Sequence, residues 1–245
     1  MIKTTLQRIY VTLIFIFLYA PIVTLIVLSF NASKTRAKWG GFTTKWYTSL
    51  FQNEAIMNAL ANTLLIAFAA SIVSTLIGTI ACIAIMNLKK RSRAIVMGIT
   101  NIPMLNAEIV TGISLMLLFV AYQRFAAQSA WLPDNIMGLP TLLIAHIAFN
   151  VPYVIFNVSP KLKQLDIKLY EAALDLGCDP RQAFFKVILP EISPAILSAF
   201  LICLTYSIDD FMISYFNCGT VETLPIAIYS MTRKKVSPEI YALST

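Results

Sequence analysis

Apolar residues are gathered into five long segments along the chain. These segments cover residues 9–30, 59–86, 94–120, 139–158 and 194–216. Each is long enough for an α-helix to cross a hydrocarbon layer of about 30 Å, which takes roughly 20 residues. Helices satisfy their own backbone polar groups in lipid, so apolar runs of this length favour helical spans. The pattern predicts an all-α polytopic membrane protein with five transmembrane helices.

The segment 159–193 differs from its neighbours because it is amphipathic and carries charges of both signs. Its apolar positions with helical spacing are Leu165, Leu169, Ala172 and Leu176. This spacing predicts an amphipathic helix that ends at Gly177, a residue suited to the position after a helix C-cap. Asp179 followed by Pro180 predicts the N-terminus of a second short helix that runs to Pro190. We therefore expect a helix-turn-helix at the membrane surface.

The composition excludes most other classes of protein. Hydrophobic residues make up 58% of the chain and charged residues 13%, against about 45–50% and about 25% in soluble domains. The mean hydropathy is +0.75, which argues against a soluble globule, a disordered chain or a secreted disulfide scaffold. The four cysteines form no CxxC pair and His146 is the only histidine, so we expect no zinc site, other metal site or cofactor.

The net charge of +7 does not indicate nucleic-acid binding, because the basic residues lie between apolar segments, where they suit anionic lipid. Basic residues are retained on the cytoplasmic side of membrane proteins. A cytoplasmic N-terminus places eleven basic residues inside, including the KKRSR run at 89–93, and eight outside. The outside set is Lys34, Arg36, Lys38, Lys45, Arg124, Arg233, Lys234 and Lys235. We expect a cytoplasmic N-terminus and a first segment that is a retained anchor, since no small-residue cleavage site follows it.

The loop contains a motif with fixed spacing. Glu171-Ala172-Ala173 is followed by three residues, Gly177, nine residues, and then Val187-Ile188-Leu189-Pro190. This resembles the EAA loop of the permease subunits of binding-protein-dependent ABC importers, with Val187 in place of the usual Ile. The chain has no GxxxxGK[ST] motif, so we expect it not to be an enzyme and ATP hydrolysis to occur in a separate subunit.

The resemblance implies a type I ABC importer permease fold and a set of partners. It implies a second permease subunit, a cytoplasmic ATPase dimer, an extracytoplasmic binding protein and the bilayer of the cell membrane. The residues expected to couple the chain to the ATPase are Glu171, Ala172, Ala173, Gly177, Leu189 and Pro190. The expected domains are residues 1–57, with the first helix and an external loop, and residues 58–245, the transporter domain with its coupling loop at 159–193.

Further stretches are similar to the permease subunits of spermidine/putrescine importers. They are GFTTKWY at 41–47, SIDDF at 207–211, TLPI at 223–226, IYS at 228–230 and VSPEIYAL at 236–243. The resemblance predicts translocation of polyamines across the bacterial cytoplasmic membrane; permeases for other small organic solutes are not separated by these motifs. The family has a sixth helix after the last stretch, so we expect this chain to be C-terminally truncated.

Three acids fall within the predicted spans. Glu108 is placed near the middle of the third span, and Asp209 and Asp210 lie in the fifth. Each costs about 2.5–3.5 kcal/mol at a helix centre unless it faces water, a partner or a cation. Carboxylates together with aromatic rings suit a polyamine, through ion pairs and cation–π contacts. We expect these acids, with Trp46 and Ser207, to line a substrate path. A structural role and a proton relay are the alternatives.

The sequence allows more than one role for several of these polar and aromatic residues. Trp46 could equally belong to an interfacial aromatic belt, and His146 is expected to be a hydrogen-bonded polar residue between helices. Adjacent residues on an ideal helix point about 100° apart, so Asp209 and Asp210 cannot share one pore unless the helix is distorted. An intramembrane aspartyl protease is a remote alternative, because the two aspartates are contiguous and no GxGD motif follows them.

Overall fold

The computed structural model describes residues 2–33, 38–128, 136–234 and 238–245. Secondary structure in these ranges is helical apart from one isolated β-bridge between Asn31 and Phe42. The helices long and apolar enough to cross a membrane are Leu6–Ser29, Glu54–Met86, Glu108–Ala126, Leu139–Gln164 and Pro180–Asp209. The predicted all-α architecture with five such helices is confirmed. The chain divides into two compact units, Met1–Leu60 with Ile226–Thr245, and Ala61–Pro225.

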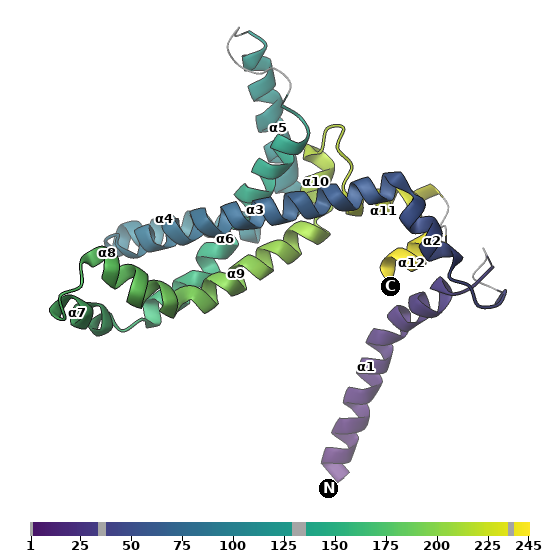
Figure 1. Cartoon of the computed structure of the whole chain (residues 1–245), viewed down its shortest axis with the longest axis horizontal. Coiled ribbons are helices and arrows are strands. Elements are labelled where there is room, and N and C mark those ends of the chain that lie inside the picture. Colours follow the sequence, from purple (N-terminus) through teal and green to yellow (C-terminus); the bar gives the residue numbers. More distant parts are fainter. Residues whose placement is uncertain (1, 34–37, 129–135, 235–237) are drawn as a thin grey trace. The chain divides into compact units, whose positions relative to one another are not determined.

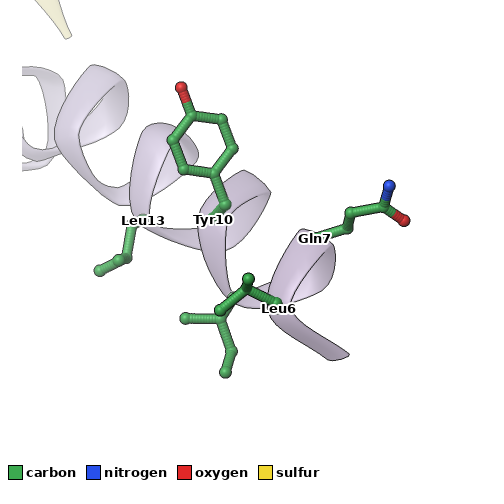
Figure 2. Close-up of a pocket in the computed structure, with 5 residues that line it drawn as sticks. Leu6, Gln7, Tyr10 and Leu13 are labelled. Atoms are coloured by element: carbon green, nitrogen blue, oxygen red, sulfur yellow. The ribbon is translucent and has the colours of Figure 1, made fainter. Parts of the chain in front are cut away.

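The first unit begins with α1 (Ile2–Ser29), an apolar helix that runs past Pro21. Most of its large apolar side chains are exposed, among them Phe17 and Leu18. Figure 2 shows Leu6, Gln7, Tyr10 and Leu13 projecting from α1, and the shallow pocket they line is formed by α1 residues alone. This surface is therefore one side of a single apolar helix, which suits lipid contact, and it encloses no ligand cavity.

The loop after α1 is held together by Asn31. Its Oδ1 accepts hydrogen bonds from the backbone N–H groups of Ser33 and Gly40, at 3.0 and 2.8 Å. The loop leads to α2 (Lys45–Gln52), which packs on α12 (Glu239–Ser244). Ser49 Oγ donates a hydrogen bond of 2.5 Å to Glu239 Oε1. The bond thus joins residues 190 positions apart in the sequence within this unit.

The second unit is organised around α6 (Leu139–Gln164), which packs on α4 (Lys90–Leu105), α5 (Glu108–Ala126), α9 (Leu189–Asp209) and α10 (Met212–Asn217). Figure 1 shows α6 and α9 running side by side. One apolar cluster joins α6 to α9 and to α3 (Glu54–Met86); its buried members are Cys82, Ile85, Val154, Ile155, Val158, Ala199 and Cys203. A second cluster joins α5, α6 and α10 through Phe119, Ala145, Phe149 and Ile213.

Glycines permit the close approach of helices at two places in this unit. A Cβ on Gly78 of α3 would lie 2.6 Å from Val154 Cβ, and one on Gly112 of α5 would lie 3.2 Å from the carbonyl oxygen of Met212. Both distances are below ordinary van der Waals contact. Such contacts by small residues are the usual means of packing helices in lipid, where the hydrophobic effect does not hold helices together. Gly112 thereby brings the start of α5 against α10.

The boundaries of two predicted spans were wrong. The segment 94–120 is two helices, α4 and α5, separated at Asn106 and Ala107, where the backbone is extended. The segment 194–216 is also two helices, because α9 ends at Asp209 and α10 begins at Met212. Apolar residues lie on both sides of each break, and hydropathy averaged over a whole span therefore does not report the breaks. Pro103, which lacks an N–H for the helix ladder, lies just before the first break.

Candidate functional site

The predicted helix-turn-helix at 159–193 is present. Its first helix is α7 (Ile167–Asp175), whose N-cap Asp166 accepts a hydrogen bond from the Lys168 backbone N–H at 3.0 Å. At its end, the N–H of Gly177 donates to the Leu174 carbonyl and the N–H of Cys178 to the Ala173 carbonyl, at 2.9 and 3.0 Å. These two bonds form a Schellman motif, which needs a residue with positive φ directly after the helix C-cap. Gly177 supplies it with φ +86°.

The second helix of the loop continues beyond the point that the sequence predicted. It begins at α8 (Pro180–Ala183), passes through a π-helical turn η1 (Phe184–Ile188) and runs on as α9. Pro190 therefore does not end the helix, which was the expectation. The wide turn ends two residues before Pro190, a residue with no N–H to donate, and π turns accommodate such interruptions. The helix-turn-helix at 159–193 is consequently continuous with a helix long enough to cross a membrane.

The exposed face of this loop includes large apolar side chains beside charged ones. Leu176 is 86% exposed and Leu169 is 51% exposed, and Glu171 and Ala172 are exposed beside them. Ala173, by contrast, is buried at 8%. Leu189 is half-buried and Pro190 is exposed at the start of α9. Large exposed apolar side chains next to a small-residue surface are typical of a protein–protein contact.

Glu108 is placed differently from the prediction. It is the first residue of α5, directly after the break at Asn106 and Ala107, and not near the middle of a continuous span. Its side chain is exposed in this chain. The positive end of the α5 dipole favours an acid in this first turn. Glu108 also interacts electrostatically with both Asp209 and Asp210, so the two helix breaks bring the three acids into one region.

Asp209 and Asp210 occupy different environments. Asp209 is the last residue of α9 and is exposed, whereas Asp210 is buried at 7% and has extended backbone (ψ 119°). The Oδ1 and Oδ2 atoms of Asp210 accept hydrogen bonds from the N–H groups of Ile213 and Ser214, at 3.2 and 2.7 Å. The helix is therefore distorted between the two aspartates, which removes the geometric conflict found in the sequence. An acid–base pair of a protease is not formed, because Asp210 is engaged with backbone.

Buried polar side chains connect the helices around this region. Ser207 is 3% exposed and its Oγ accepts a hydrogen bond of 2.8 Å from Asn150 Nδ2. Asn217 Nδ2 donates to the carbonyl oxygens of Gly112 and Ile213, at 3.2 and 2.9 Å. Thr141 Oγ1 donates to the Asn217 carbonyl at 2.9 Å. Ser207 thus contacts α6 and takes no part in the exposed acidic surface of this chain.

Comparison with known proteins identifies the family. Residues 74–234 match the model of a family described as binding-protein-dependent transport system inner membrane component. The chain belongs to this family. The matched residues include the helix-turn-helix at 159–193, both helix breaks and all three acids.

Relatives of this inner membrane component cover nearly the whole chain. It is 39% identical over 234 residues to the putrescine transport system permease protein PotI of Escherichia coli K12, covering 94% of this chain and 81% of the relative. It is 37% identical over 246 residues to the spermidine/putrescine transport system permease protein PotC of the same strain, covering 100% and 89%. The resemblance to this permease family is confirmed, and these relatives are transport proteins.

Solved structures support the fold of the inner membrane component. A chain of a bacterial ABC transporter that imports the acidic polysaccharide alginate has a TM-score of 0.74 with 18% identity, covering 99% of this chain and 88% of that one. The same kind of transporter in complex with an alginate pentasaccharide-bound periplasmic protein gives a TM-score of 0.76 with 17% identity. At this identity the likeness concerns the fold alone, and it confirms the predicted importer permease fold.

The inner membrane component also has an aromatic cluster that the sequence analysis missed. The cluster consists of Phe149 and Tyr153 of α6 and Tyr206 of α9. The ring centroids of Phe149 and Tyr153 are 5.1 Å apart, and those of Tyr153 and Tyr206 are 4.8 Å apart. Tyr206 is 40% exposed and lies one helical turn before Asp209. Tyr153 lies near Glu108. The available sequence signal was the spacing of Tyr206 and Asp209, three residues apart on one helix face.

Trp46 lies in the first unit and is 7% exposed. Its Nε1 donates a hydrogen bond of 2.8 Å to the Asn31 carbonyl oxygen. The indole therefore anchors α2 to the loop after α1, and little of its ring remains free to receive a ligand in this chain. Its expected contact with substrate stays a prediction.

Basic residues flank the helices of the inner membrane component. Arg93 of the KKRSR run donates from Nη2 to the carbonyl oxygens of Met86 and Leu88, at 2.7 and 3.1 Å, and so closes the C-terminus of α3. Lys89, Lys90 and Arg91 are exposed. Of the expected external set, Lys34, Arg36 and Lys235 lie outside the described residues, as do Val236 and Ser237 of the polyamine-type motif. His146 is buried and hydrogen-bonded between helices, as predicted.

Proposed function

We propose that this inner membrane component is a permease subunit of an ABC importer that carries polyamines, putrescine or spermidine, into the cell. The observation that carries the proposal is the agreement of two relatives, each at least 37% identical over 94% or more of this chain, that are named as putrescine and spermidine/putrescine permeases. The acids at the two helix breaks supply a matching chemistry, since polyamines are polycations.

The substrate path that we propose is built on Glu108 and Asp209. Interrupted helices are characteristic of transporter substrate sites, because non-helical backbone at membrane depth requires a protein or water-filled surrounding. An ammonium group can pair with either exposed carboxylate. Tyr206 and Tyr153 lie beside them and offer ring faces to ammonium and methylene groups. A surface that carries both carboxylates and aromatic rings suits a polyamine, in which ammonium groups are separated by short methylene linkers.

Coupling to ATP hydrolysis is assigned to the surface of α7 and α8. We propose that Leu169, Leu176 and Glu171 dock into a groove of a cytoplasmic ATPase, with Ala172 and Ala173 allowing close approach. Leu189 and Pro190 begin the membrane helix that continues from the docked segment. Closure of an ATPase dimer would then move α8 and α9 together and change the side to which the acids are open.

The partners follow from the same proposal. They are a second permease subunit, an ATPase dimer and a polyamine-binding protein outside the membrane. One structural neighbour is a transporter solved together with its substrate-bound periplasmic protein, which supports the last of these. The exposed apolar surface of α1 suits bilayer lipid.

Uptake of radiolabelled putrescine and spermidine tests the substrate. The complete transporter that contains this chain would be expressed in a bacterial strain lacking its own polyamine importers. We expect ATP-dependent uptake that unlabelled polyamines inhibit and amino acids or sugars do not. Saturable uptake of another solute without any uptake of polyamine would overturn the substrate assignment.

Site-directed labelling tests the proposed topology, with the N-terminus in the cytoplasm. Ser92→Cys in the KKRSR run and Lys45→Cys beside Trp46 both introduce exposed thiols. In a background with Cys178→Ser and Cys218→Ser, a membrane-impermeant reagent should label position 45 in intact cells, and position 92 only after the membrane is opened. Labelling of both positions from the same side contradicts the arrangement.

A further inference from the structure

A buried cluster of His146, Asp210 and Ser214 lies at the break between α9 and α10. The exposed fractions are 2% for His146, 7% for Asp210 and 1% for Ser214. His146 Nε2 shares a hydrogen bond of 3.1 Å with Ser214 Oγ and lies 3.7 Å from Asp210 Oδ2. We call these three residues the break cluster. Its members come from α6, from the break itself and from α10.

The carboxylate of Asp210 satisfies the start of α10. The N–H groups of Ile213 and Ser214 belong to the first turn of that helix, where no preceding carbonyl is available within the helix. Asp210 accepts from both, one with each oxygen. An unsatisfied buried N–H is costly, so this double acceptance fixes where α10 begins. His146 lies next to the Asp210 carboxylate and is hydrogen-bonded to the Ser214 hydroxyl, and it thereby connects the cluster to α6.

This cap also determines where α9 ends. The backbone of Asp210 is extended, with φ −63° and ψ 119°, and the helix therefore cannot include it. Asp209 is left as the terminal residue of α9, exposed and within electrostatic reach of Glu108. The direction of the Asp209 side chain thus depends on the cap made by its neighbour.

We infer that Asp210 and His146 are positioning residues: they hold the α9–α10 break so that Asp209 faces the substrate path, and neither of them binds the substrate. The assignment of Asp209 to the path rests on the proposed function. The holding of the break rests on the hydrogen bonds alone. Asp210 is accordingly removed from the set of three acids that the sequence analysis assigned to the path.

Substitutions that separate charge from capping test this inference. Asp210→Asn and Asp210→Ser remove the charge but keep one side-chain oxygen, which can still accept from a helix N–H group, whereas Asp210→Ala has no side-chain acceptor. We expect polyamine uptake by the Asn and Ser variants to stay within about threefold of the unaltered transporter, and uptake by the Ala variant to fall about 5- to 30-fold. If Asp210 paired with an ammonium group, the Asn and Ala variants would lose uptake equally.

A readout that needs no substrate tests the holding of the break directly. Asp209→Cys, combined with Cys178→Ala and Cys218→Ala, would be labelled in the assembled transporter with a water-soluble thiol reagent. We expect an unchanged labelling rate at position 209 with Asp210→Asn and a change of about fivefold or more with Asp210→Ala. His146→Leu should behave like Asp210→Ala, and His146→Gln, whose amide can reach Ser214, like Asp210→Asn.

The outcomes distinguish this inference from the substrate assignment. Rates at position 209 that are identical in all four variants overturn the positioning role, whatever the transporter carries. If the Ala variant does not accumulate in the membrane, the Asn and Ser variants decide, because a large loss of uptake by both contradicts a capping role. A transporter that carries no polyamine refutes the proposed function but leaves the labelling result valid.

Discussion

Neutralising Glu108 or Asp209 is expected to reduce polyamine uptake by roughly 30- to 150-fold with the permease still inserted in the membrane. Glu108→Gln and Asp209→Asn keep size and hydrogen-bonding capacity but remove the charge. A hydrogen bond to a charged group contributes about 1.5–3 kcal/mol. If each pair contributes about 2–3 kcal/mol to the transport transition state, that factor in rate follows. Initial rates of radiolabelled putrescine and spermidine uptake, normalised to membrane content, provide the measurement.

The matched control is Glu222→Gln. Glu222 is also exposed, and its backbone carbonyl accepts a hydrogen bond of 3.1 Å from Asn62 Nδ2. That contact survives the substitution, so uptake should be unchanged. Spermidine should be affected more than putrescine wherever its third ammonium uses the lost carboxylate. Normal uptake by both Glu108→Gln and Asp209→Asn would leave the proposed path without its physical basis.

Replacing Gly177 by proline is expected to abolish coupled transport. Proline fixes φ near −65°, while Gly177 has φ +86° and donates its N–H to the Leu174 carbonyl. A misfit of about 3 kcal/mol would reduce the population of this loop conformation by roughly 150-fold. The ATPase activity of the reconstituted complex should then lose its stimulation by loaded binding protein. Glu171→Lys, which reverses the charge on the docking surface, should weaken the same stimulation.

Gly177→Asn is the control for this prediction, since asparagine tolerates positive φ much better than other non-glycine residues. A Cβ at position 177 would meet nothing within 4 Å, so the added side chain finds open space. We expect transport near the unaltered level. Stimulated ATPase activity in the proline and lysine variants, at normal assembly, would show that the loop is not the coupling element.

The helix-turn-helix at 159–193 was predictable because its signals are local. A glycine after an amphipathic repeat and an aspartate followed by proline each specify a helix boundary from neighbouring residues. The five apolar helices were predictable because lipid imposes composition over a whole span. The continuation of α8 through a π turn was not, because proline usually marks the start of a helix at that position and here it lies within one.

The candidate site was predictable only in part. The acids are conspicuous in an apolar sequence, but the helix breaks that bring them together lie inside apolar runs. The distinction between Asp209 and Asp210 depends on hydrogen bonds to Ile213 and Ser214, and such bonds leave no mark in hydropathy. The aromatic cluster needs α6 and α9 to pack, which is a tertiary contact between segments distant in the sequence. The sequence did not show that Trp46 is buried in the first unit, where its indole N–H donates a hydrogen bond to the Asn31 carbonyl oxygen.

The continuous helix from Pro180 to Asp209 gives α8, which is the second part of the proposed docking surface, and the proposed substrate acid a fixed angular phase. Each residue of an α-helix advances the direction of the side chain by about 100°. The turn at Phe184–Ile188 is wider than an α-helical turn, so it resets this phase between the surface at one end and Asp209 at the other. The number of residues in that turn therefore determines the direction in which the Asp209 side chain points. Deleting one residue from the turn would keep the helix continuous but would change that direction.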